Sequence, residues 1–129
     1  MEQRRDPTDR IEDLRGIPDD PDLLDPILNF RRRTVIRYMS RLSGDEAVGT
    51  TELANVCAAL EHGEPYHEVS RHDYRAAYQA LRSRDLKTLS IEGIIDKRDK
   101  NTIYRGEKFD RYARLVEGLD TGLDAAESE

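Results

Sequence analysis

The sequence has no tryptophan, only one cysteine and no apolar run long enough to cross a lipid bilayer. The lone Cys57 excludes an internal disulfide and fits a reducing compartment. The first residues also lack a signal-peptide pattern, so we expect a cytoplasmic protein without a membrane segment. Only 36% of the 129 residues are hydrophobic, which predicts one domain with tails and a core near the lower limit for independent stability.

Motifs for catalysis are missing too. The chain has no glycine-rich phosphate loop, no HExxH pair and no nucleophile elbow, so we expect neither an enzyme nor a cofactor, and no small-molecule ligand is evident. The residues Cys57, His62, His67 and His72 recur every five positions and are metal-ligand types, which makes a metal-responsive regulator one alternative. A buried thiol with three exposed histidines is the simpler interpretation, and we predict no metal site.

Charge is abundant but unevenly distributed. Acidic residues outnumber basic ones by 27 to 21, and the net charge of −6 by itself argues against a nucleic-acid partner. Residues 26–41, however, contain five arginines and no acid, and residues 71–114 contain twelve basic groups against seven acidic ones. The excess of acid lies in residues 1–25, 42–70 and 115–129. Because local patches determine where a polyanion docks, DNA stays open as a partner.

Apolar residues at helical spacing predict two helices before residue 64. Asp25 and Pro26 suit the N-cap and first turn of a helix whose apolar stripe is Leu28, Val35, Tyr38, Met39 and Leu42. Thr50 or Thr51 is expected to cap a second helix that ends at Gly63. The buried face of this second helix is predicted to be Leu53, Val56, Cys57 and Leu60.

An arginine triplet, Arg31, Arg32 and Arg33, lies near the start of the first predicted helix. Three consecutive residues cover nearly all sides of a helix, so at most two of them can face one partner. They either contact backbone phosphate or pair with the acidic residues 42–70, and we favour the structural role.

Residues 70–89 predict one long helix with Ser70 as its N-cap. Its inward stripe is apolar and aromatic and consists of Tyr74, Ala77, Tyr78, Leu81 and Leu89. The flank beside this stripe carries long, donor-rich side chains, namely Arg71, Arg75, Gln79 and Arg82, with His72 and Ser83 close by. A helix with an apolar back and a donor-rich front is the shape that enters a DNA major groove. A solvated helix whose arginines keep the protein soluble is the alternative.

The next segment predicts a β-hairpin. Gly93 is expected to supply a turn into a strand with Ile94 and Ile95, residues 97–101 a polar turn, and residues 102–105 the return strand, which ends at Gly106. The basic residues near the expected tip, which would contact phosphate as a DNA-binding wing, are Lys97, Arg98 and Lys100. A solvated turn is the alternative, since Asp96 and Asp99 dilute the positive charge.

Residues 107–119 predict a last helix, and both ends of the chain predict acidic tails. The narrow apolar seam of this helix consists of Phe109, Tyr112, Ala113, Val116 and Leu119. Because the core is small, we expect the seam to pair with a second copy, with packing onto its own domain as the alternative. Residues 1–24 predict a flexible arm rather than a docked helical turn of Ile11, Leu14 and Ile17, and residues 120–129 a disordered tail.

The segments FRRRTVIRYM, TTELANV and Y-x3-Y-x2-L-x4-L-x2-L-x3-GIID, followed by a charged hairpin, resemble the winged helix-turn-helix domains of halophilic archaea. The resemblance covers about residues 25–106, and its strongest part runs from Leu86 to Asp96. The excess of arginine over lysine, seventeen to four, also resembles halophilic proteins. The sequence departs from related domains at Arg84-Asp85, where they often carry a histidine, and at Lys87, where they often carry a proline. The resemblance implies a DNA-binding or transcription-regulating module.

Together, these observations predict a mainly helical fold with a small β-hairpin, in which a winged helix-turn-helix domain at residues 25–106 is followed by a C-terminal helix. The predicted function is sequence-specific regulation of transcription by a homodimer bound to double-stranded DNA. The predicted DNA contacts are Arg71, His72, Arg75, Gln79, Arg82, Ser83, Lys97, Arg98 and Lys100. A protein-interaction module on the same fold, with its arginine faces bound to an acidic partner, is the second hypothesis.

Overall fold

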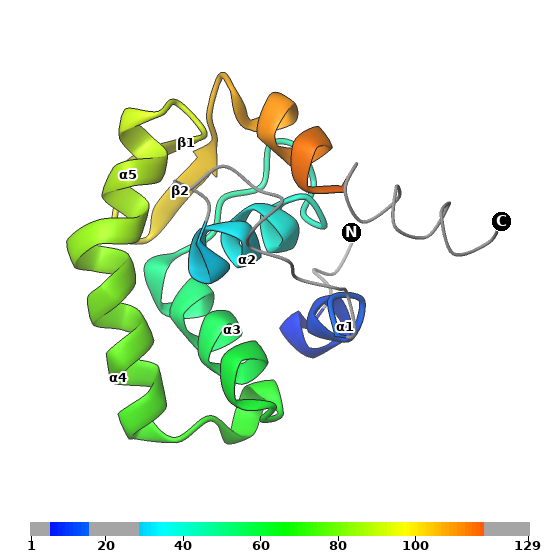
Figure 1. The fold of residues 1–129 in the computed structure, drawn as a ribbon, viewed down its shortest axis with the longest axis vertical. Helices are drawn as coiled ribbons and strands as arrows, with labels where there is room; N and C mark the ends of the chain where they lie inside the picture. The colour runs from blue at the N-terminus through cyan, green and yellow to red at the C-terminus, as the bar shows by residue number, and fades with distance from the viewer. Residues whose placement is uncertain (1–5, 16–28, 118–129) are drawn as a thin grey trace, which may run out of the picture.

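The computed structural model describes residues 6–15 and 29–117, which form a mainly helical fold with one small antiparallel sheet (Figure 1). This confirms the predicted fold class, with a layout consistent with a winged helix. The elements in chain order are α1 (Pro7–Glu12), α2 (Phe30–Met39), α3 (Thr50–His62), η2 (Tyr66–Glu68), α4 (Arg71–Ala80), η3 (Leu81–Asp85), α5 (Leu86–Ile91), β1 (Ile95–Asp99), β2 (Thr102–Arg105) and a helix in residues 109–117. In these two ranges, no helix is both long enough and apolar enough to span a membrane.

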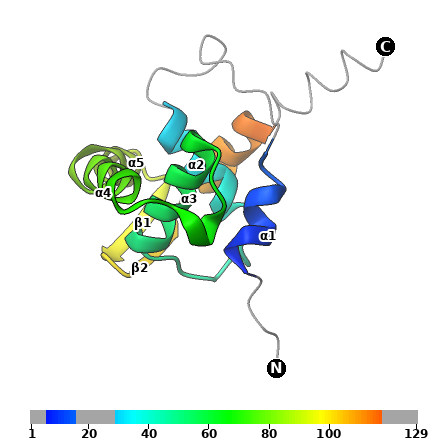
Figure 2. The ribbon, with the colours of Figure 1, turned by 90° about the horizontal axis from the view of Figure 1, so that it is seen from below.

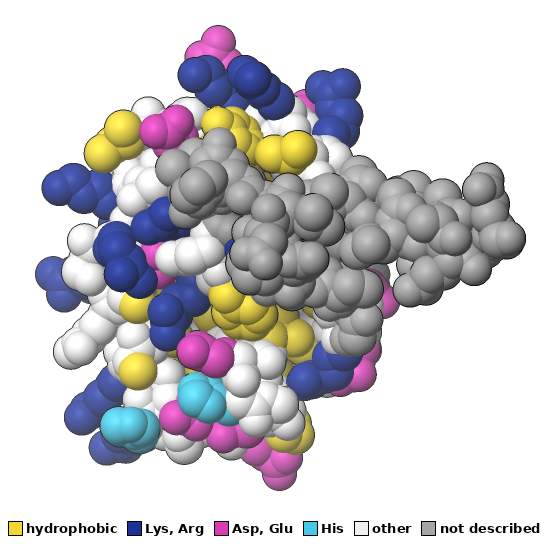
Figure 3. Space-filling view, viewed as in Figure 1, with side chains coloured by type: hydrophobic (Ala, Val, Ile, Leu, Met, Phe, Trp, Pro, Cys, Tyr) yellow, Lys and Arg dark blue, Asp and Glu magenta, His cyan; other side chains and the backbone are white. Residues whose placement is uncertain are grey.

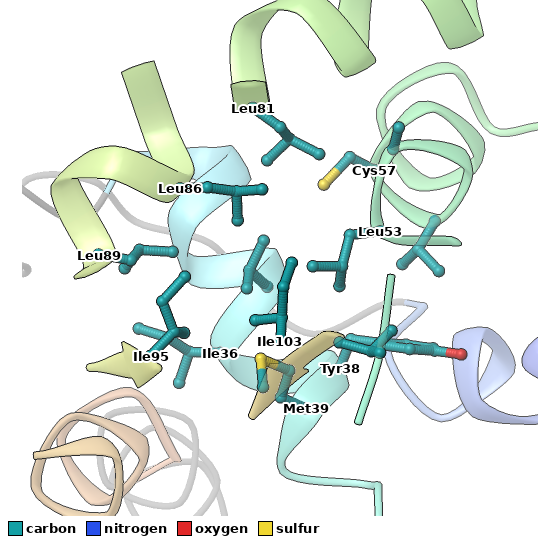
Figure 4. Close-up of a cluster of buried hydrophobic side chains, with 14 of the residues drawn as sticks. Ile36, Tyr38, Met39, Leu53, Cys57, Leu81, Leu86, Leu89, Ile95 and Ile103 are labelled. Atoms are coloured by element: carbon teal, nitrogen blue, oxygen red, sulfur yellow. The ribbon is translucent and has the colours of Figure 1, made fainter. Parts of the chain in front are cut away.

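Helix α2 forms the centre of the fold. Figures 1 and 2 show it enclosed by α3, by α4 and α5, and by the helix at residues 109–117. Eight consecutive residues, from Arg32 to Met39, are buried. The cluster in Figure 4 draws side chains from α2, α3, α4–α5 and the hairpin, including Ile36, Leu53, Leu81, Leu86 and Ile103. The predicted stripe of α2 is confirmed at Val35, Tyr38, Met39 and Leu42, whereas Leu28 lies outside the described residues.

Helix α2 begins later than predicted. Its N-cap is Asn29, whose backbone is extended and whose side chain accepts a hydrogen bond from the Arg32 amide. The helix therefore starts at Phe30, because an asparagine cap satisfies its first amides there. Asp25 and Pro26, which were expected to begin it, lie outside the described residues.

Helix α3 begins with an uncapped turn. Gly49 occupies the N-cap position and no side chain caps the helix, so the predicted cap by Thr50 or Thr51 is wrong by at least one residue. The end of α3 at Gly63 is confirmed, since φ there is +65° and favours glycine. The predicted buried face is confirmed for Leu53, Val56 and Cys57, while Leu60 is only half-buried.

The helix predicted at residues 70–89 starts as expected but changes its geometry in the middle. The Ser70 hydroxyl accepts a hydrogen bond from the Asp73 amide at 3.1 Å, which confirms the N-cap. Helices α4 and α5 are joined without a gap by η3, a π-helical turn whose first and last residues, Leu81 and Asp85, are buried. A π turn inserts one residue into the helix, which a 3.6-residue periodicity does not predict.

The β1–β2 hairpin is anchored to the loop before α3. Ile95 lies opposite Arg105 in an antiparallel pair, and a bulge between Lys97 and Asp99 lets β1 continue to Asp99. The turn is therefore limited to residues 100–101, which corrects the longer turn predicted at 97–101. Val48 adds a bridge to Ile103, with both amide-to-carbonyl distances at 2.9 Å. Such support is needed because a two-stranded hairpin is not stable alone.

Two glycines make the hairpin return tightly. Gly93 has a φ of +76°, which confirms its predicted turn. A Cβ atom added to Gly106 would lie 2.5 Å from the Gly93 carbonyl oxygen, so a side chain there would clash with backbone. The close approach of the two chain segments therefore requires glycine at residue 106.

Residues 6–15 correct the prediction of a flexible arm. They contain α1, which docks onto the domain with Ile11 fully buried and Leu14 only 7% exposed. Arg10 is buried as well, and its Nη1 donates to the Tyr38 hydroxyl at 3.4 Å while Nη2 lies 3.6 Å from Glu46. The short helix α1 docks here because Arg10 adds polar contacts to the burial of its apolar side chains. Ile17, the third residue of the predicted helical turn, lies outside the described residues.

The apolar seam of the last helix packs onto the chain's own core, which corrects its assignment to a dimer contact. Phe109 and Val116 are 1% and 0% exposed, Ala113 is 8% exposed, and Tyr112 is half-buried against the same core. These side chains are unavailable to a second copy because the small core already uses them. Leu119 and the predicted tail 120–129 lie outside the described residues.

Candidate nucleic-acid interface

One side of α4 and the start of η3 is exposed and carries four donor-rich side chains. We call this surface the α4 flank, and its members are Arg71, Arg75, Gln79 and Arg82. Spacings of four, four and three residues align them along one side of the helix. None of their side chains has a hydrogen-bond or ion-pair partner in the described parts of the chain. The flank therefore offers three guanidinium groups and one amide to a partner.

The opposite side of α4 packs against the hydrophobic core, which leaves the α4 flank exposed. Ala77 and Leu81 are 1% and 0% exposed, and the half-buried rings of Tyr74 and Tyr78 lie 5.8 Å apart beside them. The predicted apolar back is thereby confirmed. A rotation of α4 that hid the flank would expose these side chains to water, at a cost in hydrophobic burial.

Two further predicted contacts lie beside the flank. His72 is exposed near the start of α4. Ser83 is exposed too, but its hydroxyl donates to the Gln79 carbonyl oxygen at 2.6 Å. A hydroxyl whose proton is used in this way only accepts further hydrogen bonds, so Ser83 offers less to a base edge than the arginines do.

The predicted wing residues differ in how tightly the hairpin holds them. The Arg98 guanidinium carbon lies 4.8 Å from the centre of the Tyr104 ring, and its Nε lies 3.4 Å from Asp96. Lys97 is half-buried, whereas Lys100 is exposed at the turn. Arg98 is therefore partly engaged within the hairpin, while neither lysine side chain has a hydrogen-bond or ion-pair partner in the described residues.

The structure brings the α4 flank and the hairpin together around one hollow of about 170 Å³. Its lining residues come from α3, α4–η3 and the hairpin, and they are Thr50, Tyr78, Arg82, Lys97 and Lys100. Three of the predicted DNA contacts therefore border one hollow, although up to 18 residues separate them in sequence, from 82 to 100. Sequence reasoning missed Thr50 and Tyr78 as members of this group.

Positive charge gathers along the edge of the molecule formed by α4 and α5. Figure 3 shows dark-blue side chains along this edge, at the left of the view. The two acids within the same helical segment are not exposed: Asp73 is half-buried, with His62 at 3.6 Å, and Asp85 is fully buried. The edge is therefore basic even though the whole chain carries a net charge of −6.

Asp85 is a structural residue that the sequence analysis missed. Its carboxylate is fully buried, and Oδ1 accepts from Arg32 Nε at 3.1 Å and from Asn29 Nδ2 at 3.2 Å. Arg84, which is mostly exposed, reaches the same oxygen at 3.4 Å. The ion pair of Arg32 with Asp85 ties the start of α2 to the π turn that follows α4. The departure of Arg84-Asp85 from related domains marked this position, but nothing in the sequence indicated its partner.

The arginine triplet has the structural role that the sequence favoured. Arg31 pairs with Glu61, in the acidic segment 42–70, at 3.3 Å. Arg32 pairs instead with Asp85, outside that segment, and Arg33 is 2% exposed. The triplet therefore presents no exposed phosphate-binding cluster.

The residues of the Cys57 and histidine series face different neighbours. Cys57 is fully buried, and this burial raises the pKa of its thiol to about 12. His67 lies 3.2 Å from Asp6, while His62 faces Asp73. Within the described ranges, no three histidine, cysteine or acidic side chains are placed to hold one metal ion.

Comparison with known proteins identifies one family. Residues 25–105 match the family model described as Domain of unknown function (DUF7344). No curated protein and no solved structure matches the chain.

Proposed function

The chain belongs to the DUF7344 family, a domain of unknown function, and from its structure we propose that it is a sequence-specific DNA-binding regulator of transcription that acts as a homodimer in the cytoplasm. The observation that carries this proposal is the α4 flank, with its arginines and glutamine exposed and unpartnered among the described residues. No catalytic step, cofactor or metal is part of the proposal.

The α4 flank suits the edges of bases in a major groove. Arginine donates two parallel hydrogen bonds to guanine, and glutamine donates and accepts with adenine. Arg71, Arg75 and Gln79 lie on one side of the helix, so they would follow the floor of the groove together. The hairpin with Lys97 and Lys100 would then lie over the phosphate backbone and fix the orientation of α4.

Two copies are needed to read a pseudo-palindromic site and to occlude it from the transcription machinery. The dimer contact of this proposal does not use Phe109, Ala113 and Val116, because these seam residues are buried within one chain. The large apolar side chains that remain exposed among the described residues are Ile91, 72% exposed, and Leu115, 45% exposed. Light scattering of the full chain at high concentration tests this part, and a monomer would reject it.

The test of DNA recognition is a selection of bound genomic fragments followed by a gel-shift comparison. Arg75→Ala with Gln79→Ala is expected to weaken binding to the selected site by about 1–3 kcal/mol for each lost bidentate contact and to relax its sequence preference. Arg111→Ala is the matched control, since this arginine is exposed on the last helix and away from α4. Unchanged or sequence-blind binding by the double variant would reject the proposal and favour the protein-interaction alternative.

A further inference from the structure

Each described residue that lines the hollow between α3, α4 and the hairpin carries a hydrogen-bond donor on its side chain. Thr50 and Tyr78 contribute hydroxyl groups, and Arg82, Lys97 and Lys100 contribute positive charge. Among residues 6–15 and 29–117, no acidic side chain lines it. A hollow of this composition is suited to an anion that accepts several hydrogen bonds at once.

Thr50 is the most buried residue of this lining. The residue is 2% exposed, and its Oγ1 is buried without a hydrogen-bond partner. A buried hydroxyl without a partner costs free energy, and such groups in native structures call for an explanation, such as an unoccupied ligand position. Thr50 lines the hollow, and a rotation about its Cα–Cβ bond would turn this hydroxyl, which is itself closed to solvent, toward a ligand bound there.

The N-terminus of α3 adds an independent attraction for an anion. No side chain caps this helix of thirteen residues, because its N-cap is Gly49. Uncapped first-turn amides carry the positive end of the helix dipole. The Thr50 amide itself donates to the Lys100 carbonyl oxygen at 2.7 Å, which fixes the hairpin turn beside the start of the helix.

The three cations around the hollow are not neutralised by neighbouring acids. Nearby on the hairpin, Asp96 lies 3.4 Å from Arg98 and Asp99 accepts the Asn101 amide at 2.8 Å. Arg82, Lys97 and Lys100 form no ion pair within the described residues. Their mutual repulsion is relieved only by solvent or by a bound anion.

We propose that this hollow is a seat for one phosphate group, supplied either by a DNA backbone or by inorganic phosphate. Its volume of about 170 Å³ leaves room for one phosphate group. For DNA, the inference rests on the proposed function: Arg82 belongs to both the α4 flank and the hollow, so the seated phosphate borders the groove that α4 enters.

The first test uses inorganic phosphate and no DNA. The ¹⁵N-labelled full chain is titrated with phosphate in place of chloride at constant ionic strength, and amide shifts are followed at the start of α3 and in the hairpin turn. We expect saturable shifts at Thr50, Thr51 and Asn101. Thr50→Val keeps the shape of the side chain but removes the hydroxyl, and should weaken phosphate binding about tenfold. Thr51→Val is the matched control, because Thr51 is exposed.

Shifts that rise without saturation, or that are the same in Thr50→Val as in the parent chain, would overturn the seat. Loss of folding does not confuse this result, because replacing an unpartnered buried hydroxyl with a methyl group is expected to leave stability unchanged or improved. The spectrum of Thr50→Val without phosphate verifies the fold directly.

The second test separates the seat from DNA recognition. K100Q should lower the slope of log affinity against log salt by about one, with equal losses on all DNA sequences, because one phosphate contact is removed. If phosphate saturates the seat but the chain binds no DNA, the seat stands and the proposed function fails. If DNA binding depends on Arg75 and Gln79 but neither K100Q nor Thr50→Val changes it, the DNA-backbone seat is wrong and the proposed function stands.

Discussion

Helices α2 and α4 both carry arginines, but the two sets of side chains have opposite surroundings. Among the ten residues of α2, Arg32, Arg33 and Arg37 are all less than 10% exposed. In α4, also of ten residues, Arg71 and Arg75 are exposed and have no partner in the described residues. The same residue type therefore belongs to the core in one helix and to a candidate binding surface in the other.

The position of each helix accounts for this difference. Helix α2 is enclosed by other elements, so the long stems of its arginines pack along apolar surface while their charged ends reach polar partners (Figures 1 and 2). Helix α4 lies at the edge of the molecule and uses only its apolar back for packing. The ion pair of Arg32 with Asp85 connects α2 with η3, the turn that continues α4.

This arrangement gives the buried arginines a role in the exposed surface. The Arg32–Asp85 pair holds the π turn against the start of α2, and Arg82 lies within that turn. We infer that α2 determines where the α4 flank points. Variants of the two arginine sets should consequently separate a loss of folding from a loss of binding.

The largest effect is expected from Asp85→Ala. The substitution leaves Arg32 as a buried charge without its carboxylate, and breaking such a pair from one side costs about 3–5 kcal/mol. Urea unfolding of the full chain, followed by circular dichroism, measures the loss. Arg84→Ala is the control: Arg84 reaches the same carboxylate but is mostly exposed, so its loss should stay below about 1 kcal/mol. Equal losses in the two variants would contradict the distinction between buried and exposed arginine.

Arg105→Met should have the next largest effect, about 2 kcal/mol. Arg105 Nη2 donates to the Met39 and Leu42 carbonyl oxygens at 2.9 and 2.8 Å, and its guanidinium lies 4.9 Å from the Phe109 ring centre. Methionine keeps the packing of the stem but leaves carbonyl groups at the end of α2 without this donor. Arg98→Met, on the exposed side of the same hairpin, is the control and should change the free energy of unfolding far less. The prediction is checked by thermal unfolding and fails if Arg98→Met is equally damaging.

A smaller effect is expected where α2 reaches the surface. Arg31 and Glu61 form a partly exposed ion pair at 3.3 Å. A double-mutant cycle with Arg31→Gln and Glu61→Gln should give a coupling energy of about 0.2–1 kcal/mol that decreases at high salt. A coupling above about 2 kcal/mol would show that this arginine also belongs to the core of α2.

Features caused by nearby residues could be predicted from the sequence. The Ser70 cap depends on an amide three residues later, and the turns at Gly63 and Gly93 depend on backbone angles that favour glycine. Helical and strand spacing likewise predicted the order of the main helices and the hairpin from α2 onward, because it reflects one buried face in each. The exposure of the α4 flank followed from the same spacing, whereas its contact with DNA stays a prediction.

Features caused by distant residues could not be predicted. The Arg32–Asp85 bond joins residues 53 apart, and the Arg10–Tyr38 bond joins residues 28 apart. A charged residue in a periodic pattern indicates an exposed position by default, since arginine is almost never fully buried unless it is paired. The docking of α1 and the π turn at Asp85 both depend on such pairs, so local patterns assigned the first to a flexible arm and missed the second.

The smallest change in stability is expected from the α4 flank itself. Arg71→Gln and Arg75→Gln remove charges that form no hydrogen bond or ion pair with a described residue, so each should change the free energy of unfolding by less than about 0.5 kcal/mol. Their affinity for a selected DNA site should nevertheless fall by about 1–3 kcal/mol where a bidentate contact is lost. Arg32→Gln is the opposite case. It should lower the free energy of unfolding more than either α4 variant does, because its partner Asp85 is fully buried. Denaturant unfolding and gel-shift titration of the same three variants would test both halves of the comparison. A destabilisation above about 1 kcal/mol at Arg71 or Arg75 would mean that α4, like α2, uses its arginines to hold the fold together.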